Sequence, residues 1–170
     1  MPASTHTSSE RDTERSTTAK AVDATKLLSA DHKEVKKLFK EYDKLAKAEA
    51  TDEEKQAVAE QICTMLTVHA TIEEEIFYPA AREAMEERDL LDEAEVEHAS
   101  AKDLIAHIRG MSPGDELYDA KVKVLGEYVD HHVQEEEKEL FPKLRKADLD
   151  LKEIGAALEA RKQQLMNEMV

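Results

Sequence analysis

An internal duplication constrains the fold of this chain more than any other feature. Residues 69–79 (HATIEEEIFYP) have a counterpart in residues 132–142 (HVQEEEKELFP). In both segments a histidine is followed by glutamate at the fourth position, an aromatic residue at the ninth and proline at the tenth. Two isolated histidines, His32 and His98, also match, because an acid precedes each and a leucine follows six residues later. The chain is therefore predicted to contain two helical hairpins related by a pseudo-two-fold axis.

The apolar residues recur at spacings of three and four, which is typical of amphipathic helices. This period predicts long helices at about 23–48, 51–79, 89–108 and 116–145, and a short fifth helix at about 151–166. Pro79 and Pro142 are expected to kink or interrupt the second and fourth helices near their ends. Four long helices with short loops predict an all-α, up-down-up-down four-helix bundle, followed by a short C-terminal helix.

Composition supports a single helical domain and excludes several classes of partner. The 170 residues suit one hydrophobic core, and only 4 Gly and 4 Pro argue against an all-β sandwich or barrel. The formal net charge of −15 argues against binding to nucleic acid or to an anionic membrane surface. The chain has no apolar run of the length that a membrane span needs.

The N-terminus and the single cysteine add two further expectations. Residues 1–20 contain nine Ser or Thr and almost nothing apolar, so we expect a disordered tail followed by a helical domain at 21–170. Cys63, in an apolar run, is expected to be a buried small hydrophobe. One cysteine cannot form an intramolecular disulfide or a Cys-based zinc cluster, and we expect a cytoplasmic protein.

The histidine–glutamate pairs carry the chemistry. Residues four apart lie on the same face of a helix, so His69 with Glu73 and His132 with Glu136 each present two ligands to one side. Two such helices facing each other direct all four side chains into one volume, where one isolated histidine from each remaining helix completes the set. The predicted metal ligands are His32, His69, Glu73, His98, His132 and Glu136. Imidazole and carboxylate ligands suit iron, manganese or zinc, and bundle cores are a recurring place for paired metals.

The remaining histidines are excluded from the predicted site. His6 lies in the tail, and His107 is half a helical rotation away from His98. His131 with Glu135 is an alternative pair shifted by one residue, but the alignment on Pro142 favours His132. We therefore expect His131 beside the ligands or on the surface.

The whole pattern resembles the hemerythrin-like (HHE cation-binding) domain family: an isolated His, His-x3-Glu, a second isolated His, and a second His-x3-Glu, with an aromatic and proline ending helices two and four. The resemblance covers about residues 23–145. It implies a four-helix bundle with a non-haem di-iron centre, oxo- or hydroxo-bridged, rather than a manganese or zinc site. Glu73 and Glu136 would bridge the two irons.

The chain departs from the oxygen-carrying members of that family. Those proteins supply five His, one Glu and one Asp, whereas this chain offers four His and two Glu, with Lys102 at four residues after His98. More coordination positions are therefore left for exogenous ligands. Tyr42 or Tyr128 is a further possible ligand, and core aromatic packing is the simpler interpretation of both.

The sequence is compatible with three alternative functions. The first is a di-iron protein that binds, senses or detoxifies a small oxidant such as dioxygen, peroxide or nitric oxide, with catalase-like disproportionation of peroxide as its catalytic form. Its ligands would be reached through a dry cavity lined by Leu66, Ile76 and Leu125. The second is an iron-binding, storage or sensor module that acts through a partner, and the third is a metal-free structural bundle. We expect a monomer or a weak homodimer.

Overall fold

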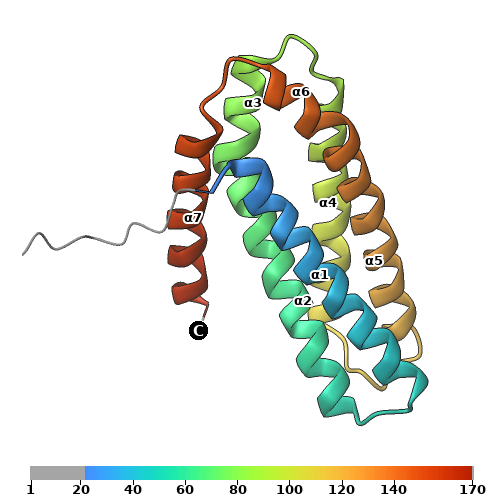
Figure 1. Cartoon of the computed structure of the whole chain (residues 1–170). Coiled ribbons are helices and arrows are strands. Elements are labelled where there is room, and N and C mark those ends of the chain that lie inside the picture. The colour runs from blue at the N-terminus through green and yellow to red at the C-terminus, as the bar shows by residue number, and fades with distance from the viewer. Residues whose placement is uncertain (1–21, 170) are drawn as a thin grey trace, which may run out of the picture.

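The computed structural model describes residues 22–169, and all of the regular secondary structure in this part of the chain is helical (Figure 1). The predicted tail at 1–20 lies outside the described residues. The elements are α1 (Ala24–Lys47), α2 (Asp52–Ile72), η1 (Glu73–Phe77), α3 (Tyr78–Ala84), α4 (Asp89–Arg109), α5 (Tyr118–Glu135), η2 (Glu136–Leu140), α6 (Phe141–Lys146) and α7 (Leu151–Glu168).

Four rods form the bundle that the sequence predicts. Helices α1 and α4 are two of them, and the continuous runs α2–η1–α3 and α5–η2–α6 are the others (Figure 1). Helix α7 lies outside the four, against α1 and α2. The helix starts follow from local capping: the Asp23 side chain accepts from the Thr25 backbone N–H, and Thr51 and Glu54 form the predicted capping box.

The two prolines do not end their helices. Each is preceded by a π-helical turn, η1 or η2, whose backbone hydrogen bonds span five residues: the Tyr78 N–H donates to the Glu73 carbonyl, and the Phe141 N–H donates to the Glu136 carbonyl. A proline ring collides with the carbonyl four residues earlier and lacks an N–H, and a π-turn accommodates both defects without breaking the helix. The expected interruption is therefore a local widening, and in both rods it begins at the motif glutamate.

The hydrophobic core has two parts, one on each side of the motif histidines. One cluster contains Leu28, Phe77 and Leu158, and the other contains Val35, Ile62 and Leu125. On α1, His32 lies between Leu28 of the first cluster and Val35 of the second. The bundle thus surrounds a polar layer with apolar packing above and below it.

Two smaller expectations can be compared with the structure. Cys63 is buried in the second cluster and unpaired, as expected for a small hydrophobe, and burial raises the pKa of its thiol to about 11. Between residues 22 and 169, no helix combines the length and the hydropathy that crossing a bilayer requires.

Candidate metal centre

The structure brings all six predicted ligand side chains into one layer of the bundle. They are His32 on α1, His69 on α2, His98 on α4, His132 on α5, Glu73 at the start of η1 and Glu136 at the start of η2. Their nitrogen and oxygen atoms form two overlapping quartets, each with all four atoms within 4.8 Å of one another. One quartet contains His32 and His69, the other contains His98 and His132, and Glu73 and Glu136 belong to both.

The ligand layer is buried. Glu73 has no exposed surface and Glu136 is 2% exposed, and the four histidines are nearly as inaccessible. Two carboxylates buried this deeply are costly unless positive charge or hydrogen bonds compensate them. The glutamates therefore require cationic partners within the layer.

The inward-facing atoms have the chemistry of a cation site. Within the described residues, Nε2 of His32, Nε2 of His69, both Glu73 oxygens and Oε2 of Glu136 are buried without a hydrogen-bond partner. His69 Nε2 nevertheless lies 2.6 Å from Glu73 Oε1, and His32 Nε2 lies 3.2 Å from Glu136 Oε2. A cluster of unpartnered buried polar atoms requires an explanation, and a bound cation that accepts their lone pairs supplies one.

A second set of carboxylates lies on the outer side of the histidine rings. His32 Nδ1 is 2.8 Å from Glu137 Oε1, and His69 Nδ1 is 3.0 Å from Asp31 Oδ2. A carboxylate can only accept, so in both rings Nδ1 carries a hydrogen, and Nε2 is the nitrogen that faces inward and would present its lone pair to a bound cation. Metal-binding histidines usually have such an acceptor on the other ring nitrogen.

In the second quartet the histidine Nδ1 atoms also face carboxylates, but the distances are longer. His98 Nδ1 is 3.5 Å from Glu74 Oε2, and His132 Nδ1 is 3.6 Å from Glu97 Oε2, which are ion-pair distances rather than good hydrogen bonds. These four outer acids follow the repeat, because each lies next to a motif residue in the sequence. The sequence analysis did not predict these contacts. The pattern that could have indicated them is an acid beside each isolated histidine and beside each motif glutamate.

The charges in the layer shift the pKa of several groups. Burial disfavours a charged His69, but the nearby Glu73 charge and the bonds to Asp31 and Glu73 outweigh burial and raise its pKa to about 10. His132 behaves alike: burial opposes its charge, and Glu136 and Glu97 together raise its pKa to about 11. For His98, burial prevails and lowers the pKa. The layer thus favours positive charge strongly near the glutamates.

Tyr78 is a further side chain in the layer, and the sequence had not indicated it. Its hydroxyl donates to Glu136 Oε1 and lies 3.2 Å from Nε2 of both His98 and His132. Burial, together with the Glu136 and Glu73 charges, raises the pKa of this phenol well above its ordinary value. The signal was a difference between the repeats, since the aromatic position ahead of proline is Tyr78 in one and Phe141 in the other.

The two tyrosines considered from the sequence lie elsewhere. The Tyr42 hydroxyl donates to Asp119 Oδ1 at 2.6 Å, in the second hydrophobic cluster. Tyr128 is half exposed at the rim of a cavity. His131 pairs with Glu135 on the surface and is 69% exposed, and His107 is also exposed, as expected. His6 lies outside the described residues.

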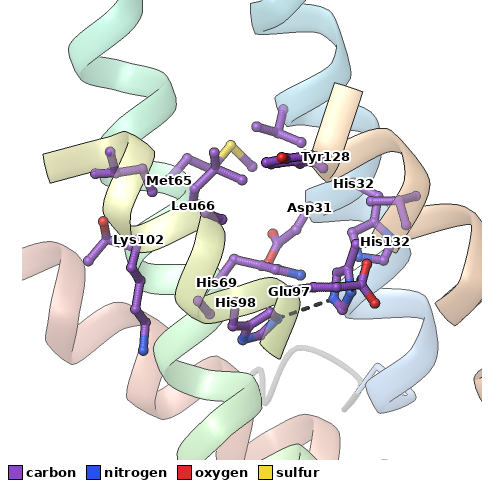
Figure 2. A pocket seen from close by; sticks show the side chains of 17 residues that line it. Asp31, His32, Met65, Leu66, His69, Glu97, His98, Lys102, Tyr128 and His132 are labelled. Carbon is purple, nitrogen blue, oxygen red and sulfur yellow. Dashed lines mark hydrogen bonds and ion pairs between the residues drawn. The ribbon is translucent and has the colours of Figure 1, made fainter. Parts of the chain in front are cut away.

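An apolar cavity of about 50 Å³ reaches the ligand layer, and the four histidines form part of its wall (Figure 2). Apolar side chains dominate its wall; they include Val35, Met65, Leu66, Ala101, Ile105 and Val129. Of the three residues expected to line such a cavity, only Leu66 does so. Leu125 and Ile76 instead pack in the two hydrophobic clusters. The cavity admits a molecule of a few atoms, and Asp31, Glu97 and Tyr128 add polar groups to its wall.

Known proteins resemble the chain in sequence and in fold. Residues 23–166 match the family model of the hemerythrin HHE cation binding domain. A DNA nickase from a Nostoc species is 33% identical over 120 residues, which is 70% of this chain and 32% of the nickase, so the chain spans about a third of that relative. A crystal structure of a hemerythrin HHE cation binding domain-containing protein from Mycobacterium kansasii has the same fold. It superposes with a TM-score of 0.72 at 24% identity, covering 86% of this chain and 89% of that one.

The family match extends over the whole bundle and over α7, and its description as cation-binding agrees with the buried His/Glu cluster. The chain therefore belongs to the hemerythrin HHE cation-binding domain family.

Proposed function

We propose that this chain is a non-haem di-iron protein that binds, senses or detoxifies a small oxidant in the cytoplasm. One observation carries the proposal: the two quartets share Glu73 and Glu136. Two carboxylates common to two sets of histidines would allow each glutamate to be a ligand of both metal ions. The proposed ligands are those expected from the sequence: His32, His69, Glu73, His98, His132 and Glu136.

Iron is the metal that the proposal favours over manganese and zinc. Imidazole and carboxylate ligands suit all three metals, so the preference for iron rests on membership in the hemerythrin family. When bound, iron would supply the one-electron chemistry that reaction with an oxidant requires. The protein's part would be to fix the ligands on rigid helices and to hold the ring tautomers through Asp31 and Glu137.

The two metal positions would differ by one oxygen donor. The Tyr78 hydroxyl lies among His98, His132 and Glu136, whereas no tyrosine of the described residues hydrogen-bonds to His32 or His69. We assign Tyr78 to the second position as a further ligand or as a hydrogen-bond donor to what binds there. Phe141 lies on the other side, where its ring stacks on His32 with 6.0 Å between centroids.

The cavity supports a small, weakly polar ligand. Its volume of about 50 Å³ suits dioxygen, nitric oxide or peroxide, and most of the surface that it exposes is apolar. DNA nicking is not proposed, because the chain matches only about a third of the nickase and its net charge of −15 opposes binding to a phosphate backbone.

The experiment loads the full chain with Fe(II) under anaerobic conditions and adds dioxygen, hydrogen peroxide or nitric oxide separately. The proposal expects new absorption bands with at least one reagent, and oxygen evolution with peroxide would assign the catalase-like form. The zinc-loaded protein is the matched control, since it keeps the ligands occupied but cannot change oxidation state. Bound iron with an unchanged spectrum under all three reagents would instead favour the storage or sensor function.

A further inference from the structure

Helix α7 lies outside the four-helix bundle but is firmly docked on it (Figure 1). Leu158 is fully buried in the hydrophobic cluster that also contains Leu28. The Gly155 backbone approaches so closely that a β-carbon there would lie 1.8 Å from the Val22 carbonyl oxygen. The first half of α7 is thus fixed by packing, and its second half runs beside α1 and α2.

Two neighbouring basic residues in that second half bind two different acids. Arg161 forms two bonds to Glu75, with Nε 2.7 Å from Oε2 and a terminal nitrogen 3.2 Å from Oε1. Lys162 Nζ lies 2.6 Å from Asp31 Oδ1. The two basic side chains are equally accessible, at 27% and 28%, but Glu75 is 46% exposed and Asp31 only 6%.

Asp31 connects Lys162 to the ligand layer. Its Oδ1 accepts from Lys162, and its Oδ2 accepts from Nδ1 of His69 at 3.0 Å. Lys162 therefore fixes the carboxylate that sets the tautomer and the ring orientation of His69. Glu75 has no comparable hydrogen bond to a histidine among the contacts of the described residues.

The second repeat lacks this connection. The acid equivalent to Asp31 is Glu97, which lies 3.6 Å from Nδ1 of His132. Among the described residues, Glu97 forms no ion pair with a lysine or arginine. An effect transmitted through Lys162 should therefore act first on the quartet that contains His69, and should reach the other quartet only through the shared glutamates.

We propose that Lys162 is a positioning residue that couples the docking of helix α7 to metal binding at the His32–His69 position. The inference rests on the proposed metal centre and adds a remote residue to it. By thermodynamic reciprocity, docked α7 favours metal binding at this position, and the bound metal in turn stabilises α7 on the bundle. In the part of the chain that the structure describes, His98 and His132 have no equivalent link to α7, so metal binding at their position should change less.

The test compares Lys162→Met with Arg161→Met in the full chain, by Fe(II) titration under anaerobic conditions. Lys162→Met is expected to weaken one of the two binding steps by about tenfold. This is the lower end of the loss of metal affinity that follows when a residue supporting a metal-binding histidine is removed. Arg161→Met is expected to stay within about twofold of wild type, because an exposed ion pair contributes little. Lys162→Arg keeps a positively charged partner for Asp31, so this variant should bind both ions as wild type does.

Hydrogen exchange of the α7 amides, with and without Fe(II), gives the reciprocal readout. Iron should slow exchange in α7 of wild type and of Arg161→Met, but not in Lys162→Met. Exchange in the metal-free variants also shows whether α7 has stayed docked. If wild type binds two ions and both methionine variants behave alike, the coupling is wrong and the metal centre stands. If wild type binds no metal, the proposed function fails and the coupling with it.

Discussion

Tyr78 and Phe141 occupy the same place in the two repeats, one residue before proline, but only Tyr78 brings a hydroxyl into the ligand layer. Phe141 stacks on His32 instead. The pseudo-two-fold symmetry of the bundle is therefore broken at the site itself. Two metal ions bound there would not be equivalent.

Replacing Tyr78 by Phe removes this difference. The buried hydroxyl donates to the Glu136 carboxylate, so Tyr78→Phe should lower the free energy of unfolding of the metal-free protein by about 1.5–3 kcal/mol. In the Fe(III)-loaded protein, any visible band from a tyrosinate ligand should disappear while the number of bound ions is unchanged. Chemical denaturation and absorption spectroscopy measure the two effects. Phe141→Tyr is the matched control, and a tyrosinate band that survives in Tyr78→Phe would contradict the assignment.

His131 and His132 are adjacent in the sequence, yet only His132 faces the ligand layer. His132→Ala should remove one bound ion per chain, because its quartet loses a nitrogen ligand. His131→Ala should leave metal content unchanged, since that ring is 69% exposed and pairs with Glu135. Elemental analysis of the two variants makes the comparison. Metal loss in His131→Ala but not in His132→Ala would mean that the motif is His131 with Glu135, and equal loss in both would contradict the distinction between the two histidines.

Gly155→Ala tests how tightly α7 is docked. In an exposed helix this change stabilises a protein by up to about 1 kcal/mol, because alanine has the higher helix propensity. At this position the new β-carbon would collide with the Val22 carbonyl, so a loss of about 1–3 kcal/mol is expected. Thermal or urea unfolding determines the sign. A more stable Gly155→Ala variant would show that α7 does not lie where the structure places it.

Asp119 gives a pH-dependent stability far from the metal centre. Burial opposes its ionisation, but Lys55 and the Tyr42 hydroxyl outweigh burial and hold its pKa below the ordinary value of 3.8. A depressed folded-state pKa means that this contribution is complete above 3.8 and is lost as the pH falls through the lower folded-state value.

Comparing wild type with Asp119→Asn isolates this contribution. Wild type should be more stable by about 1 kcal/mol at neutral pH, because Asp119 is half exposed and its ion pair is partly screened. The difference should shrink as the pH falls below 3.8. Urea unfolding of both proteins across the acid range measures it. A stability difference that stays constant down to the lowest pH would contradict the pKa direction.

The helices and the six inward side chains were predictable because both depend on local periodicity. A spacing of four puts His69 and Glu73 on one helix face whatever the tertiary structure, and the repeat shows which faces meet. The position of the Tyr78 hydroxyl in the layer was harder to predict, because an aromatic residue before proline is equally typical of packing in a hydrophobic core. Pro79 and Pro142 predicted an irregularity in each helix, but the sequence did not indicate that it would be a π-turn.

The outer contacts of the site could not be derived from the sequence. Asp31 precedes His32 in the chain but bonds to His69, a pairing that depends on how α1 and α2 approach each other. The Lys162 contact depends on where α7 docks, and no local pattern specifies that position. The proposed ligands could therefore be identified from their spacing, whereas the residues that contact their outer sides could be identified only from the packed structure.

The number of metal ions per chain tests the central claim most directly. The full chain is reconstituted with Fe(II) under anaerobic conditions, freed of unbound iron and analysed for metal and protein. Two ions per chain are predicted for wild type, with loss of both when Glu73→Gln and Glu136→Gln are combined, because these carboxylates belong to both quartets. A wild-type chain that holds one ion or none, or a double variant that keeps two, would contradict a carboxylate-bridged pair.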